Sequence, residues 1–115
     1  MIRKSLALIL ALISGLHLHS QVEFSFISSE KLSEKINSEF EETAPVFDRK
    51  GQILYFTRSL HPKNKGGTFG GQDIWLSQKT GLNWGEPSND LKQVNNKVNN
   101  SVIGISTNGD TLYLL

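Results

Sequence analysis

Cysteine is absent from this chain of 115 residues, and histidine and proline are sparse. Without cysteine the fold can form no disulfide, and thiol catalysis and zinc–thiolate sites are excluded. A lipoprotein anchor is also excluded, because its lipid is carried on a cysteine. An excess of one charge is lacking too, since 12 Lys and Arg stand against 11 Asp and Glu. The chain therefore lacks the excess of positive charge that is typical of proteins that bind nucleic acid or an anionic membrane surface.

A hydrophobic run long enough to span a membrane is also missing. The apolar run at residues 5–16 is shorter than the about 20 residues that a spanning helix needs. It follows Arg3 and Lys4 and precedes the small residue Ser20, an order typical of a secretory signal peptide. We therefore predict a cleavable signal peptide at residues 1–20, with an uncleaved anchor as the alternative. The mature chain that remains after cleavage is expected in the periplasm, at the outer membrane or outside the cell. It has ten basic and eleven acidic residues, so its net charge is −1.

The strongest pattern that is present is an internal repeat with a period of 58 residues. Residues 36–56 align without a gap with residues 94–114. The identical pairs include Asn37 and Asn95, Gly51 and Gly109, Leu54 and Leu112, and Tyr55 and Tyr113. A fixed period indicates a repeated structural unit, each copy of which needs a neighbour to cover its apolar face.

Short strands separated by turn signals follow the same period. We expect strands at residues 45–47, 52–57, 73–77 and 84–87, and again at 101–106 and 111–115. Gly51 and Gly109 supply the positive φ that tight hairpin turns require. Pro87 lacks an N–H donor, which suits the outer edge of a sheet. The prediction is an all-β chain with one four-stranded antiparallel unit and the first hairpin of a second.

These elements divide the chain into four segments. They are the signal peptide at 1–20, a lead-in at 21–43, the first unit at 44–93 and the start of a second unit at 94–115. The lead-in opens with a strand-like stretch at 22–27 and is expected to pack loosely. Four-stranded β units that repeat along a chain can pack around a common axis as a closed ring, but only when several units are present. One and a half units cannot close such a ring, and residues 112–115 would form an apolar edge strand without a neighbour. We therefore interpret the chain as the amino-terminal piece of a longer protein.

The longest connection, residues 59–72, holds the candidate ligand loop. Its candidate residues are His61, Lys63, Lys65, Gly66, Gly67, Gly70 and Gly71. The lysines precede the glycines and a strand follows, which does not match a phosphate-binding loop. A solvated loop is the favoured interpretation. If the unit binds a ligand directly, this loop is the first candidate, because loops on a rigid sheet carry function.

The remaining polar and aromatic residues fit structural roles better than catalytic ones. Asp73 is expected to accept hydrogen bonds at a corner of the unit, with a ligand or calcium contact as the alternative. The aromatic residues are expected to fill the core, with a sugar-stacking platform as the alternative; they are Phe47, Tyr55, Phe56, Trp75 and Trp84. No catalytic triad, nucleophile elbow or metal-ligand pattern is recognisable, so neither an enzyme nor a cofactor or metal is predicted.

Several motifs in order resemble a known family. Residues 42–58 resemble the opening of a TolB-type, WD-repeat-like β-propeller blade. The third strand, the exit and the start of the next blade are matched by residues 70–75, 83–87 and 94–95. Residues 61–67 and 99–104 resemble the variety found in exported OmpA-family envelope proteins of the Bacteroidetes type. The usual Asp-Gly turn of that family is Lys50-Gly51 here.

This resemblance implies an incomplete propeller that serves as a non-enzymatic module in the cell envelope. The implied partners are envelope proteins or peptidoglycan, although no residue present carries a wall-binding activity. The blade motif would rest on Gly51, Asp73, Trp75 and Gly109. Two alternatives stay open: the propeller domain of an exported prolyl-oligopeptidase-like hydrolase, and a glycan-binding propeller that uses Trp75 or Trp84.

Overall fold

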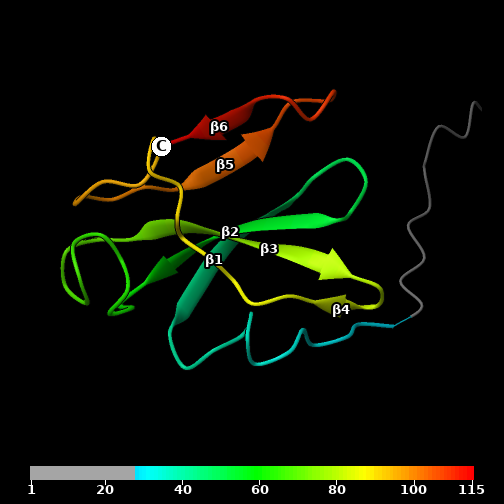
Figure 1. Ribbon diagram of the computed structural model, residues 1–115, viewed down its shortest axis with the longest axis horizontal. Coiled ribbons are helices and arrows are strands. Elements are labelled where there is room, and N and C mark those ends of the chain that lie inside the picture. The colour runs from blue at the N-terminus through cyan, green and yellow to red at the C-terminus, as the bar shows by residue number, and fades with distance from the viewer. Residues whose placement is uncertain (1–27) are drawn as a thin grey trace, which may run out of the picture.

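The computed structural model of the protein describes residues 28–115, and the regular elements in this part are all β-strands. The expected signal peptide and the strand expected at 22–27 lie outside the described residues. One antiparallel sheet has the order β1 (Glu41–Phe47), β2 (Ile53–Ser59), β3 (Asp73–Thr80) and β4 (Asn83–Trp84) (Figure 1). A second sheet pairs β5 (Val102–Ile105) with β6 (Leu112–Leu114). The predicted all-β class and the four-plus-two arrangement of strands are confirmed.

β1 begins at Glu41, three residues before the expected start of the unit at 44. The strand continues through Pro45 because its pairing with β2 shifts register between Thr43 and Val46. Ala44, inside this irregularity, has a φ of 50°. A bulge takes the proline, which has no N–H donor, out of the ladder, and β1 has no further strand of this sheet beyond it.

The other end of the sheet also differs from the expected bounds. β3 extends to Thr80, beyond the expected end at 77, and Gly81 turns the chain with a φ of 62°. β4 contains only two residues, and beyond it a single bridge joins Ser88 to Leu76. Pro87, between them, limits the ladder because it cannot donate a hydrogen bond.

The core lies on one face of this sheet, under the lead-in. Leu54, Phe56 and Trp75 pack there with Ile36, and all four are buried. Residues 28–35 of the lead-in, which were expected to pack loosely, are exposed apart from the half-buried Leu32, whereas Ile36 after them is buried. Ile36 fills the core because the apolar face of β2 and β3 needs a cover, and the chain just before β1 is within reach.

The two hairpins repeat each other at the level of single hydrogen bonds. In the first turn the N–H of Gly51 donates to Asp48 O, and in the second the N–H of Gly109 donates to Ser106 O, both at 2.9 Å. The two glycines have φ values of 64° and 81°. The strand pairs Val46–Tyr55 and Gly104–Tyr113 are also equivalent at the 58-residue period.

The turn before each hairpin repeats as well. The N–H groups of Ile36 and Asn37 both donate to Ser33 O. One period later, the N–H groups of Val94 and Asn95 both donate to Leu91 O. The turn and the hairpin that follows it thus recur in the structure at the 58-residue period.

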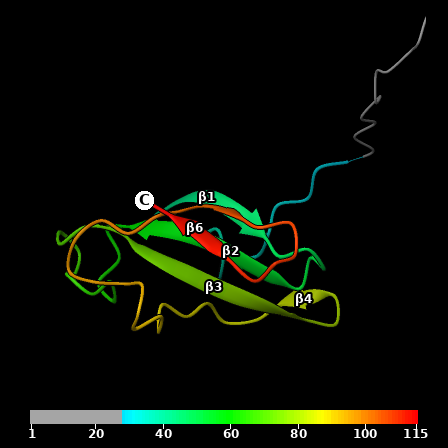
Figure 2. The same cartoon turned by 90° about the horizontal axis from the view of Figure 1, so that it is seen from above.

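The second hairpin lies against the first sheet, and β5 contacts β1 and β2 (Figure 1). The hydroxyl groups of Ser101 and Thr57 form a buried hydrogen bond of 3.0 Å across this junction. Val102 is buried beside them, and the N–H of Asn100 donates to Gln72 O. The 60–72 loop lies at the end of the sheet opposite the β3–β4 turn in both views (Figures 1 and 2).

Candidate functional site

The candidate ligand loop is folded onto the sheet by three polar side chains, of which Asn64 and Asp73 are buried. Asn64 donates from Nδ2 to Arg58 O at 2.9 Å and to Gly71 O at 3.2 Å, and its Oδ1 accepts from the Trp75 indole at 3.0 Å. Asp73 accepts from the N–H of Lys65 at 2.8 Å. Because buried polar groups are costly to leave unpaired, these bonds fix the path of the loop.

The third of these side chains, Asn89, ties the loop to the end of the first unit. Its Nδ2 donates to Lys63 O at 2.7 Å and to the Asp73 carboxylate at 2.9 Å. Asp73 is fully buried, and both protons that it accepts come from groups of the fold. In this geometry its carboxylate holds a corner of the unit.

The glycines of the loop serve its compact shape. The backbones of Gly66 and Gly70 approach so closely that a Cβ atom on either residue would clash with the other. Gly67 and Gly71 have positive φ values of 74° and 113°. These four glycines therefore make a tight turn possible, and the N–H groups of Gly67 and Gly70 are used within it.

His61 packs inside an aromatic group. Its ring makes edge contacts with Phe40 and Trp75, with centroid distances of 4.5 and 4.6 Å. Its Nδ1 accepts from the N–H of Lys63 at 3.1 Å. Burial, followed by the positive charges of Arg58 and Lys63, lowers the pKa of His61 below its usual value of 6.5. A neutral histidine is therefore part of the packing.

Arg58 is the buried charge that sequence reasoning missed. Its Nε lies 2.9 Å from Glu42 Oε1, and its Nη2 donates to Lys35 O at 3.0 Å. The guanidinium also lies over the Phe56 and Trp75 rings, at 5.1 and 4.6 Å from their centroids. The signal in the sequence was the alternation of Leu54, Phe56 and Arg58, which puts all three on one face of β2.

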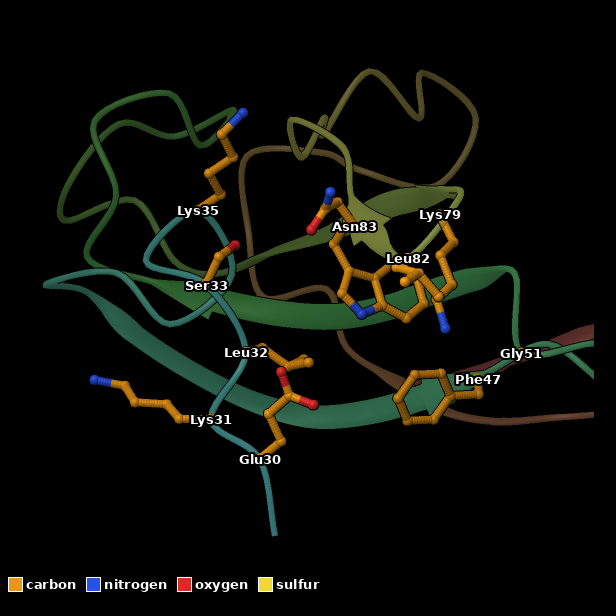
Figure 3. Close-up of a pocket in the computed structure, with 11 residues that line it drawn as sticks. Glu30, Lys31, Leu32, Ser33, Lys35, Phe47, Gly51, Lys79, Leu82 and Asn83 are labelled. Carbon is orange, nitrogen blue, oxygen red and sulfur yellow. The ribbon is translucent and has the colours of Figure 1, made fainter.

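A hollow lies at the β3–β4 end of the sheet, beside the lead-in (Figure 3). It has a volume of about 820 Å³. Its lining residues are Glu30, Lys31, Leu32, Ser33, Lys35, Phe47, Gly51, Lys79, Leu82, Asn83 and Trp84. Three lysines against one glutamate give this lining a positive charge.

An aromatic pair forms the floor of this hollow. The Phe47 and Trp84 rings lie 5.8 Å apart at 47°, and Lys79 Nζ lies 5.7 Å from the Trp84 ring. Phe47 is 48 % exposed, so the expectation that it fills the core is wrong. It lies at the end of β1, beyond the cover that Ile36 gives to the centre of the sheet. Trp75, in contrast, is only 3 % exposed and cannot present its ring to a ligand.

The candidate residues thus separate into two places. His61, Asp73 and Trp75 belong to the packed loop, whereas Phe47 and Trp84 belong to the hollow. No group of three His, Cys, Asp or Glu side chains able to hold a metal ion occurs within residues 28–115. The same range contains no helix with the length and apolar character to cross a membrane.

No family model, curated protein or solved structure matches the chain. The resemblance to propeller blades of envelope proteins therefore stays a prediction from the motifs.

Proposed function

We propose that this protein is a non-enzymatic interaction module of the cell envelope, built from tandem β units of the propeller type. The observation that carries the proposal is the 58-residue period, which is present in the turns, the strand register and the preceding Ser33 and Leu91 turns. Units that repeat in this way stack on one another and present extended surfaces to partners. The exported location is supported by the signal-peptide pattern at residues 1–20.

The use of polar groups in the loop also supports a binding role over a chemical one. His61, Asn64 and Asp73 are engaged with the fold, and each has a partner there. The exposed features include the hollow with its aromatic floor. Surfaces of this kind bind partners, such as envelope proteins or peptidoglycan.

Co-sedimentation with purified peptidoglycan, together with in-cell crosslinking to envelope proteins, tests this function. We expect the full chain to associate with at least one of the two, and Trp84→Ala to weaken that association about tenfold or more, since interface aromatics are frequent hot spots. Phe69→Ala is the matched control, because Phe69 is 92 % exposed and lies outside the hollow. An export-competent, folded chain that associates with neither would overturn the proposal.

A second candidate function, glycan binding, is favoured by the hollow itself. The Trp84 ring lies beside Phe47 with polar side chains around it, including Asn83 and Ser33. Aromatic faces bordered by hydrogen-bonding groups suit the apolar faces and hydroxyls of sugars. A glycan array probed with the full chain should show binding that is lost in Trp84→Ala and kept in Phe69→Ala, with unchanged melting temperatures.

A further inference from the structure

The β3–β4 turn holds Lys79 against the aromatic floor of the hollow. Lys79 and Trp84 are paired across the two strands, and side chains directly opposite each other in an antiparallel pair lie on the same face of the sheet. Lys79 Nζ lies 5.7 Å from the Trp84 ring, and the centroid of that ring lies 5.8 Å from that of Phe47. The register thus places a positive charge beside an apolar aromatic surface.

Of the three lysines that line the hollow, Lys79 is the one directed at this floor. Figure 3 shows the side chains of Lys31 and Lys35 extending away from Phe47, whereas the Lys79 side chain extends toward it. Lys35 is also engaged, because its Nζ lies 3.3 Å from Glu86. Within residues 28–115, neither of the two ion pairs involves Lys79. Its ammonium group is therefore available to a negatively charged ligand.

Other polar groups around the hollow are not used by the fold. Ser33, Asn83 and Trp84 line it, and their side chains form no hydrogen bond within the described part of the chain. The acidic side chain of the lining, Glu30, comes from the lead-in, whereas Lys79 comes from β3 (Figure 3). A ligand can therefore place a negative group at Lys79 and hydroxyl or amide groups along the rest of the hollow.

We propose that the hollow binds an acidic sugar, whose ring stacks on Trp84 and whose carboxylate lies at Lys79. The inference rests on the glycan-binding function proposed above and adds the chemical class of the glycan. Aromatic faces bind the apolar C–H face of a sugar ring. An ammonium group beside that face donates a charge-assisted hydrogen bond to a carboxylate, which a neutral sugar cannot accept. Sugars of this class include the lactyl-bearing amino sugar of peptidoglycan and the uronic acids of other polysaccharides.

Two matched pairs of disaccharides, titrated into the full chain and followed by NMR, test the proposal. N-acetylglucosaminyl-N-acetylmuramic acid differs from di-N-acetylchitobiose by its lactyl group, and cellobiouronic acid differs from cellobiose by one carboxylate. We expect the acidic member of at least one pair to bind about fivefold tighter than its neutral partner, with shift changes at the Trp84 indole N–H. The pair that shows the preference identifies the source of the acidic sugar.

Three lysine variants test whether Lys79 makes this contact. Lys79→Gln removes the charge and should abolish the preference for the acidic sugar, while the affinity for the neutral sugar stays within about twofold. Lys79→Arg keeps the charge and should keep the preference. Lys97→Gln is the matched control for net charge, because Lys97 is exposed and lies outside the hollow. It should leave the preference unchanged.

The salt dependence gives a readout on the unsubstituted chain, so the conclusion does not depend on how a variant folds. Raising the salt concentration from about 20 mM to about 500 mM should reduce the preference for the acidic sugar, because ions screen the charge of Lys79. The affinity for the neutral sugar should not change.

Three outcomes would overturn the inference: equal affinity for the members of both pairs, a preference that survives in Lys79→Gln, or shift changes confined to residues outside the hollow. Equal affinity with shift changes at Trp84 keeps glycan binding and removes the recognition of charge. If none of the four sugars binds, glycan binding fails together with this inference. The association with envelope proteins is decided separately by the crosslinking experiment.

Discussion

Asn37 and Asn95 occupy the same position of two units in different surroundings. Asn95 is buried at the junction, where its Oδ1 accepts from Ile74 N and its Nδ2 donates to Ile74 O, both at 2.8 Å. It also donates to Asn89 O at 2.9 Å. Asn37 is half-buried and donates to Leu32 O at 3.0 Å. One side-chain type thus clamps a neighbouring strand in one copy and closes only its own turn in the other.

Replacing these two asparagines measures what the clamp contributes. Asn95→Ala should lower the free energy of unfolding by about 1–3 kcal/mol, because it leaves the buried N–H and C=O of Ile74 without their side-chain partner. Asn37→Ala should cost about 0.5–1 kcal/mol, the value of a single hydrogen bond. Urea denaturation of both variants measures the difference, and equal losses would show that the junction does not depend on the clamp.

Protonation of His61 should destabilise the fold in mild acid. Its pKa is lowered from 6.5 in the folded chain, so the folded state binds fewer protons than the unfolded state below that pH. Stability should therefore be constant above pH 6.5, and should decrease as the pH falls from there toward the folded-state pKa. His61→Phe keeps an aromatic ring between Phe40 and Trp75 and should flatten this decrease. Denaturation midpoints between neutral and mildly acidic pH measure it, and an unchanged slope in His61→Phe would contradict the assignment.

At the scale of elements, Arg58 joins the lead-in, β1 and β2. Glu42→Ala should cost about 3–5 kcal/mol, because it leaves the Arg58 charge buried and without its carboxylate partner. Glu41→Ala, one residue earlier on β1 and exposed, should change stability by less than about 0.5 kcal/mol. Thermal unfolding of the two variants is the measurement. Similar melting temperatures would mean that Arg58 finds other partners once Glu42 is gone.

The elements that the sequence predicted correctly are those with local signals. Apolar runs marked β2 and β3, and the Lys50-Gly51 and Asn108-Gly109 pairs marked the hairpin turns. The contacts of Asn64 and Asn89 could not be predicted from local patterns, because their partners are distant in the sequence. The start of β1 was missed for a related reason, since a proline inside a strand is tolerated only where a bulge removes it from the ladder.

The candidate site was predictable only in part. The sequence identified the 60–72 loop and the aromatic residues as candidates. It did not predict that the loop is packed against the sheet while Phe47 and Trp84 line an exposed hollow. Which face of a sheet a covering segment reaches depends on packing across the sheet. Ile36 covers Phe56 and Trp75 and does not reach Phe47, and this decides which aromatic residues can meet a ligand.

For the whole molecule, hydrogen exchange should separate the middle of the first sheet from its exposed turns and loops. The Leu54 and Phe56 amides point into the β2–β3 ladder and should exchange slowly. Phe69 and Leu82 lie outside the strands and are both 92 % exposed, so their amides should exchange much faster. Amide exchange followed by NMR measures both pairs in one sample. Equal exchange rates of the two pairs would contradict the β2–β3 register.

The shared spacing of turns, bulges and strand pairs has a consequence at the level of the gene. A crossover between the coding segments for the two hairpins, at matching positions, would remove or add 58 codons and shift no turn out of place. The number of units in such a protein can therefore change in a single recombination event. The Asp48 and Ser106 side chains, which both accept backbone protons in equivalent turns, show that copies then diverge in residue type while keeping their geometry.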